Sequence, residues 1–236
     1  MKDKPRSLEL IAEDISACRQ CDRLVAWRER VGREKRRAYR LETYWSRPVP
    51  GFGDPNASLV IVGLAPGAHG ANRTGRMFTG DRSGDFLYAA LFRAGVASQP
   101  TSKYRDDGQA LSGVFITAPC RCVPPENKPT VQELLTCRPW LIEELRCLPR
   151  ARTYLALGKT GYDAVVALSR THGDVAHVPA FAHGVGVELP DPAGRGERAW
   201  LFGSYHVSQQ NTQTRKLTEA MFDEVLTAAL TRARGA

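Results

Sequence analysis

The chain has 236 residues, a hydrophobic fraction of 42% and a formal net charge of +8 at pH 7. This length is enough for one α/β domain with a sizeable core, and no apolar run approaches the roughly 18 residues that a membrane span requires. The amino-terminal residues MKDKPRSLEL lack the apolar stretch of a secretory signal peptide. We therefore expect a cytoplasmic protein without a membrane partner, and its positive charge favours nucleic acid as the partner.

The first predicted element leads into a pair of cysteines. An amphipathic helix near residues 6–17 ends at Cys18-Arg-Gln-Cys21, a spacing that places two thiolates on one metal centre. A redox C-x-x-C normally follows a strand of a βαβ unit, whereas this pair follows a helix, so metal binding is the favoured interpretation. All-thiolate ligation suits zinc and a [4Fe–4S] cluster alike, and residue chemistry leaves both open. The thiols that would complete the site are Cys120, Cys122 and Cys137.

Residues 22–57 are predicted to form a long basic excursion that is rich in turns at its end. Basic residues gather at 28–40, in the run RERVGREKRRAYR. A run of this kind is usually a solvated helix face or a mobile excursion, and contact with DNA phosphates is the alternative.

The segment from Ser58 to Asp81 is the most informative part of the chain. An apolar strand at 58–63 precedes a loop that holds five glycines, and an amphipathic helix at 83–95 follows. An open α/β sheet builds its ligand crevice from such strand-end loops, because glycine lets the backbone approach a ligand closely. A glycine-rich loop alone favours the alternative, an ordinary turn between a strand and a helix.

The rest of the chain alternates strands with helices. Thr130 is placed to cap a helix, because Glu133 stands three residues further on. Alternation of this kind predicts an α/β protein, a three-layer α/β/α sandwich around a mostly parallel four-stranded sheet. We expect one domain over residues 1–236, with segment 1–57 packed on it. The further predicted elements are a strand at 113–118, the helix after Thr130, a strand at 153–158, a helix at 160–170, a short strand at 184–189, a strand at 199–203 and a helix at 214–233.

A second polar segment, SYHVSQQN, follows the strand at 199–203 directly. Its histidine, His206, stands where the crevice rule places catalytic groups. Short hydroxyl and amide side chains, such as those that follow it, suit phosphate and groove contacts. A core histidine is the alternative for His206 taken alone.

The two segments together resemble the uracil-DNA glycosylase superfamily, specifically its iron–sulfur type B branch, which is family five. Motif one of that branch reads GLAP, then His-Gly, Asn-Arg-Thr-Gly-Arg and Phe, and all of these occur between Gly63 and Phe78. Motif two continues from its histidine to Ser and Gln-Asn-Thr, and here Val207 replaces the proline of the superfamily. The cysteine pattern of the family implies that the ligands of a [4Fe–4S] cluster are Cys18, Cys21, Cys122 and Cys137, with Cys120 as the alternative to Cys122.

The resemblance implies a DNA glycosylase that hydrolyses the N-glycosidic bond of uracil in DNA, and of other deaminated bases such as hypoxanthine, at the start of base excision repair. His206 would donate to uracil O2, and loop amides would stabilise the departing anion as an oxyanion hole does. The best-known branches place a water-orienting aspartate where this chain has Ala65, so Asn72 is the preferred group for that task and Asp81 ranks behind it.

The resemblance also implies the residues that bind the base and the DNA. Phe78 would stack on the flipped base. The asparagine that reads the uracil edge in related enzymes falls at Ala118, and Asn127 is the closest amide. The implied substrate-binding residues are Gly63, Leu64, Ala65, Gly67, Phe78, Asn127 and Ser208, and the implied DNA contacts are Arg73, Arg76, Gln209, Gln210 and Asn211.

We expect a monomer that acts on double-stranded, and also single-stranded, DNA at the nucleoid. Two other functions stay open at this stage. One is a non-catalytic, metal-containing module that binds nucleic acid, and the other is a hydrolase of free nucleosides.

Overall fold

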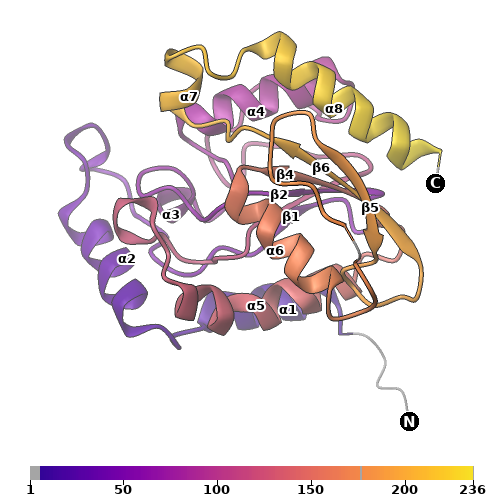
Figure 1. Cartoon of the computed structure of the whole chain (residues 1–236). Coiled ribbons are helices and arrows are strands. Elements are labelled where there is room, and N and C mark those ends of the chain that lie inside the picture. Colours follow the sequence, from indigo (N-terminus) through magenta and orange to yellow (C-terminus); the bar gives the residue numbers. More distant parts are fainter. Residues whose placement is uncertain (1–5, 176, 236) are drawn as a thin grey trace.

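Four apolar segments form the parallel centre of a six-stranded sheet (Figure 1) in a computed structural model that describes residues 6–175 and 177–235. The inner strands pair in parallel, which confirms the predicted parallel centre, and an antiparallel strand is added at each edge, so that the sheet has six strands rather than the expected four. In spatial order the strands are β1 (Phe52–Gly53), β3 (Val114–Thr117), β2 (Leu59–Val62), β4 (Thr153–Leu157), β6 (Arg198–Ser204) and β5 (Gly186–Pro190).

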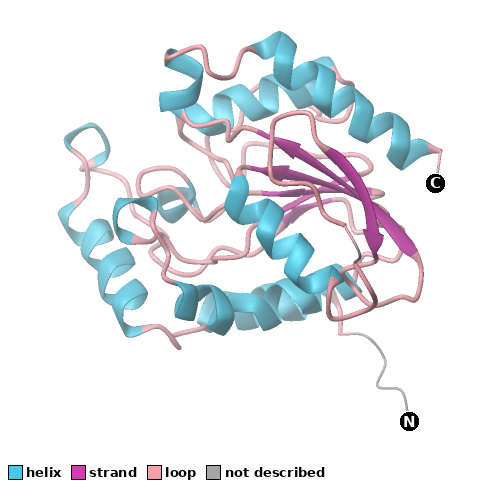
Figure 2. Ribbon diagram, viewed as in Figure 1, coloured by secondary structure: helices cyan, strands magenta, loops and turns pink. Residues whose placement is uncertain are grey.

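Helices cover both faces of this sheet (Figure 2). In β2, Leu59 and Ile61 pack into one core and Val60 and Val62 into the other, because successive side chains of a strand point to opposite faces. The first core is closed by α4 (Arg82–Arg93) and α8 (Glu219–Arg234), and the second by α5 (Val131–Arg146) and α6 (Lys159–Ser169). The predicted α/β/α sandwich is therefore confirmed.

The amino-terminal part of the chain contains two helices. Helix α1 (Leu8–Ala17) was predicted and packs against α5. Helix α2 (Asp22–Glu34) begins directly after Cys21 and corrects the expected excursion. Its inward stripe is Leu24, Arg28 and Val31, so an arginine stands where the helical pattern normally has an apolar residue. Because Arg28 interrupts the apolar pattern, sequence analysis did not predict this helix.

Short helical turns follow three of the inner strands. These are α3 (Ala71–Thr74) after β2, the 3₁₀ turn Pro125–Asn127 after β3 and α7 (Gln209–Gln213) after β6, and a further 3₁₀ turn, Arg37–Tyr39, follows α2. The last helix begins at Glu219 rather than 214, because Thr218 caps it and residues 214–217 form a turn after α7. The predicted capping box of Thr130 and Glu133 is present.

None of the helices in the described part of the chain combines the length and apolar character needed to cross a membrane.

Candidate active site

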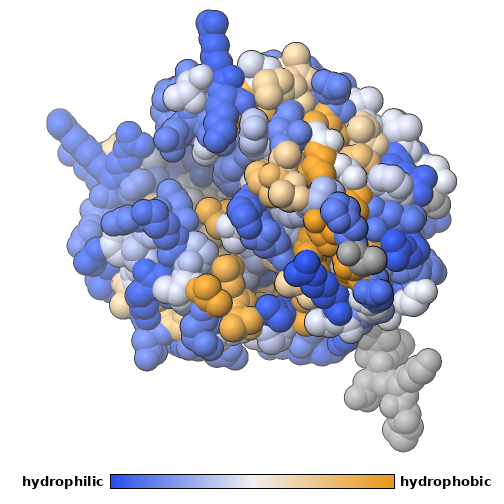
Figure 3. Space-filling view, viewed as in Figure 1, coloured by the Kyte–Doolittle hydropathy of each residue, from blue (hydrophilic) through white to orange (hydrophobic). Residues whose placement is uncertain are grey.

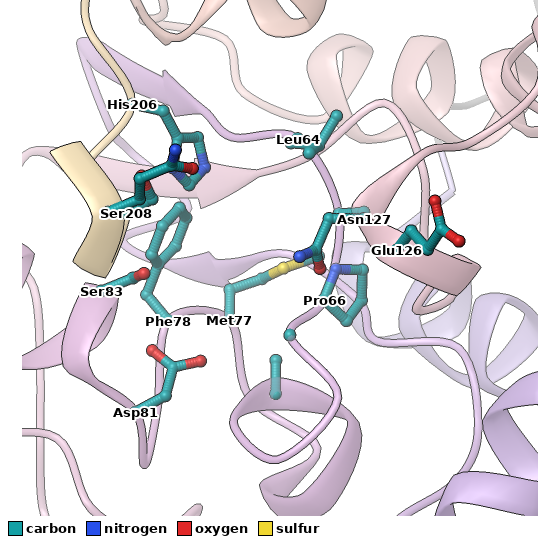
Figure 4. A pocket seen from close by; sticks show the side chains of 14 residues that line it. Leu64, Pro66, Met77, Phe78, Asp81, Ser83, Glu126, Asn127, His206 and Ser208 are labelled. Atoms are coloured by element: carbon teal, nitrogen blue, oxygen red, sulfur yellow. The ribbon is translucent and has the colours of Figure 1, made fainter.

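The loops after β2, β3 and β6 meet around one cavity of about 340 Å³. Figure 4 shows His206 and Phe78 on one side of this cavity and Asn127 on the other. We call this cavity the base pocket, after the nucleobase that the resemblance implies it would bind. In the view of Figure 1 the surface is hollowed between the loop after α2 and α7, with mostly hydrophilic surroundings (Figure 3). Gly63, predicted to bind the substrate, lies outside the lining, whereas Gln210, predicted to contact DNA, is part of it. The residues predicted for base binding or catalysis that do line the cavity are Leu64, Ala65, Gly67, Phe78, Asn127, His206 and Ser208.

Glycine at position 63 lets the Phe78 ring reach the pocket. A Cβ added to Gly63 would lie 2.9 Å from that ring, which is too close for real atoms. Phe78 itself has a φ of 51°, a left-handed conformation that is costly for an aromatic residue and that surrounding structure must enforce. Gly63 therefore supports the wall of the pocket from behind.

His206 enters the pocket as a neutral imidazole. Burial lowers its pKa to about 4, so the ring carries one N–H donor and no charge at neutral pH. The loop that carries it is held by Asn211, whose Nδ2 donates to the His206 carbonyl at 2.8 Å. Val207, the departure from the family's proline, is fully buried and packs into the core.

Two polar side chains on the wall could hold a water molecule. Asn127 lines the pocket with a φ of 58°, directly after Glu126 with a φ of 54°. Two consecutive non-glycine residues in this region indicate a backbone held for function. Asp81 also lines the pocket, and burial raises the pKa of its carboxyl group. It caps α4 at the same time, because its Oδ1 accepts from the Gly84 amide at 3.0 Å.

Asn72 does not reach the pocket. Its side chain is fully buried in α3, and Nδ2 donates to the main-chain carbonyl of Arg28 at 3.3 Å. The structure therefore does not place Asn72 on the wall of the pocket, where it was expected to position the attacking water.

The two arginines of motif one are also turned inward. Arg73 forms an ion pair with Glu42 and donates to the Gly80 carbonyl at 2.8 Å. Arg76 donates to Asp107 at 2.6 Å. Each side chain is only 5% exposed, which corrects the expectation that the two arginines contact DNA. They support the motif-one loop from inside instead.

A second, charged cavity of about 550 Å³ shares Asp81 with the base pocket. Its exposed basic residues are Arg36, Arg82 and Lys103, and Gln209 also lines it. Sequence analysis missed Arg82 and Lys103, because nothing in their local pattern separates them from other surface cations. Arg36 belongs to the basic run at 28–40, for which contact with DNA phosphates was the alternative interpretation. Asn211, expected at the DNA, instead supports the His206 loop.

The cysteines predicted as ligands line one small cavity, together with Arg28 and Arg121. Cys120 lies outside this lining, and its thiol donates to the Cys122 carbonyl at 3.2 Å. In the described residues no three or more His, Cys, Asp or Glu side chains are arranged to hold a metal ion. The cavity-lining cysteines are Cys18, Cys21, Cys122 and Cys137.

Comparison with known proteins agrees with the motifs. A family model described as the uracil DNA glycosylase superfamily matches residues 50–230. The type-5 uracil-DNA glycosylase of Thermus thermophilus is 52% identical over 221 residues, which cover 94% of this chain and 96% of the relative. The proteins of the same name from Mycobacterium bovis and Pyrobaculum aerophilum are 51% and 43% identical, over 91% and 90% of this chain and 78% and 87% of their own lengths. The chain therefore belongs to the uracil-DNA glycosylase superfamily, in the branch numbered five.

Proposed function

We propose that the chain removes uracil from DNA by hydrolysing the bond between uracil N1 and deoxyribose C1′. The observation that carries this proposal is the base pocket itself. It brings an aromatic ring, a neutral histidine and an amide together from loops that follow three strands. This set can stack a flipped base, receive its developing charge and orient a water molecule.

The bond between N1 and C1′ breaks with its electron pair on uracil, so negative charge develops on the base while C1′ becomes cationic. His206 donates its N–H to the O2 oxygen, where part of that charge gathers. A neutral donor suits this task, because it keeps its proton while it stabilises the anion. The oxygen of water then bonds to C1′, and the proton that this water loses balances the charge of the departing uracil.

Asn127 and Asp81 take the place of Asn72 as the groups that orient this water. Both line the pocket, and both carry oxygens that accept hydrogen bonds from water. Asp81 stands close against the loop glycines, since a Cβ on Gly70 would fall 1.8 Å from its Oδ2. The glycines of motif one therefore make room for this carboxylate beside the pocket.

We propose a tolerance for other deaminated bases, hypoxanthine among them. Ala118, which aligns with the base-reading asparagine of related enzymes, is buried and lies outside the lining. The wall therefore lacks the asparagine that would distinguish uracil from a purine with a carbonyl group in place of its amine. Removal of such bases is the opening step of base excision repair, carried out by a monomer on DNA at the nucleoid.

A [4Fe–4S] cluster held by Cys18, Cys21, Cys122 and Cys137 is part of the proposal. Arg28 supports this assignment, because it is 2% exposed beside these sulfurs and no carboxylate of the described residues pairs with it. A buried cation requires an anion, and four thiolates supply one. The cluster would clip the amino-terminal helices to the segment at 122–137, since a metal site that joins distant segments contributes to folding.

Incubation of the purified protein with oligonucleotides that carry one uracil or one hypoxanthine tests the activity. Alkali-labile breaks at the modified position are the expected result. Binding without breaks at high protein concentration would point to the non-catalytic module, and release of uracil from free deoxyuridine would point to a nucleoside hydrolase. Iron and zinc analysis of the same preparation tests the cluster, for which absorbance near roughly 400 nm is expected.

A further inference from the structure

Arg28 interrupts the apolar stripe of α2 in its buried part. Leu24 and Arg28 are 1% and 2% exposed, and Val31 completes the inward face. A buried arginine costs several kcal/mol unless an anion and hydrogen-bond acceptors receive its charge. The acidic residues of its own helix do not serve. Glu29 pairs with Arg19 and Glu34 with Arg30, while Asp22 is exposed in the first turn and forms no ion pair with Arg28.

The guanidinium of Arg28 is directed at the cysteine site. Its Nη1 donates to the sulfur of Cys122 at 3.0 Å, and its Nη2 donates to the carbonyl of Cys18 at 3.1 Å. The other arginine of this cavity, Arg121, is neutralised by Glu144 at 2.7 Å. Among the described residues at this cavity, Arg28 is therefore the buried cation without a carboxylate partner. Its charge is left for the cysteine sulfurs to balance.

The main chain of Arg28 touches motif one. Its carbonyl accepts from Nδ2 of Asn72, and the amide of Asn72 donates to the carbonyl of Gly67 at 3.0 Å. Gly67 lines the base pocket. A continuous chain of contacts thus runs from Cys122 through Arg28 and Asn72 to the pocket wall.

We propose that Arg28 is a positioning residue that balances the negative charge of the cysteine site and, through Asn72, fixes the motif-one loop at the base pocket. This inference rests on the proposed cluster. A [4Fe–4S] cluster with four thiolate ligands carries net negative charge, which one buried guanidinium offsets in part. Hydrogen bonds to the sulfurs and nearby charge set the reduction potential of such a cluster. The potential therefore reports whether Arg28 acts on it.

Arg28→Met removes the charge and the N–H donors while it keeps much of the side-chain volume. Arg28→Lys keeps the charge, and Arg30→Met is the matched control, because Arg30 lies half-exposed on the same helix. The measurements are iron content and protein-film voltammetry of each purified, cluster-loaded protein. They are followed by hydrogen exchange of the amides at 67–75.

Loss of the cation disfavours the reduced cluster. Arg28→Met is expected to move the one-electron equilibrium about tenfold toward the oxidised form, a decrease of about 59 mV. Arg28→Lys should retain most of the wild-type potential, and Arg30→Met should shift the equilibrium less than about twofold, because exposed charges are screened. Exchange at 67–75 should be faster in Arg28→Met alone.

An unchanged potential in loaded Arg28→Met would overturn the proposal. If Arg28→Met purifies without iron, wild-type iron content in Arg28→Lys supports charge balance, and an equal loss in both variants overturns it. Uracil excision by the wild-type protein is measured separately. If the wild-type protein excises uracil but the reduction potential of Arg28→Met equals that of wild type, only this inference is rejected. If the wild-type protein does not excise uracil, the proposed function is rejected.

Discussion

The ring of Phe78 lies 6.2 Å from the ring of His206, measured between centroids, and the two planes are inclined by 32°. One ring belongs to motif one and the other to motif two, so this contact joins the two strand-end loops at the base pocket. A uracil stacked on Phe78 would present its edge to the histidine. In the proposed mechanism the two rings would therefore place base capture beside charge stabilisation.

Replacement of His206 by alanine should lower uracil excision by about 10²–10³-fold, the usual cost of one donor to a developing anion. Single-turnover rates on a uracil-containing duplex measure this, and binding of the duplex should change little. A rate within a few-fold of wild type would show that His206 is not the donor.

The pH dependence follows from the low pKa of His206. Burial lowers this pKa from 6.5 to about 4, so the imidazole stays neutral across the physiological range. The histidine's contribution to the excision rate should be constant between about pH 8 and pH 5 and change only as pH approaches 4. The unfolded chain binds a proton at this histidine below its pKa of about 6.5, so the His206 contribution to stability should decline as pH falls from about 6.5 toward 4. In His206→Gln this decline should be smaller in chemical unfolding at several pH values.

Gly63→Ala should lower excision by displacing the Phe78 ring, since the new methyl group would lie 2.9 Å from it. Phe78→Ala should also lower excision, through loss of stacking on the flipped base. If both act through the same ring, the double variant should be little worse than Phe78→Ala. Strictly additive losses in single-turnover rates would mean that Gly63 has a separate role.

Arg82→Gln and Lys103→Gln should each weaken DNA binding and make it less sensitive to salt. Both residues are exposed in the charged cavity that shares Asp81 with the base pocket. Loss of one phosphate contact reduces the slope of log K against log salt by about 0.9. Titrations from low to high salt measure this slope. Arg198→Gln is the control, because Arg198 lies on β6 with an exposed side chain paired to Glu188, and an equal change there would argue against this path for the DNA.

The sheet and most of the pocket could be predicted from the sequence because they depend on patterns. Apolar runs locate the inner strands, and parallel strands present their carboxyl ends at one edge of the sheet. The resemblance to the glycosylase motifs then implied that Phe78 and His206 meet at this edge. Single side chains follow no such rule. Asn72, Arg73 and Arg76 stand in motif one, yet the short helix α3 and its C-terminal turn direct them inward.

Helix α2 and the contacts of Arg28 could not be predicted from the sequence pattern. A helical stripe is recognised by its apolar residues, and a buried arginine removes one of them from the pattern. Only the contacts of the folded chain, in which the guanidinium donates to the sulfur of Cys122 and to the carbonyl of Cys18, show what receives the cation there.

The two asparagines of the site offer a direct comparison. Asn127→Ala should lower the excision rate by about 10²-fold with only a small loss of stability, because its exposed side chain would orient water at the pocket, while alanine tolerates the φ of 58° less well than asparagine. Asn72→Ala should lower the free energy of unfolding by about 1–3 kcal/mol, since it removes a buried donor from the Arg28 carbonyl. Thermal unfolding and single-turnover kinetics of both variants separate these effects. If Asn72→Ala were stable but unable to excise uracil while Asn127→Ala stayed active, Asn72 and not Asn127 would be the residue that positions the water.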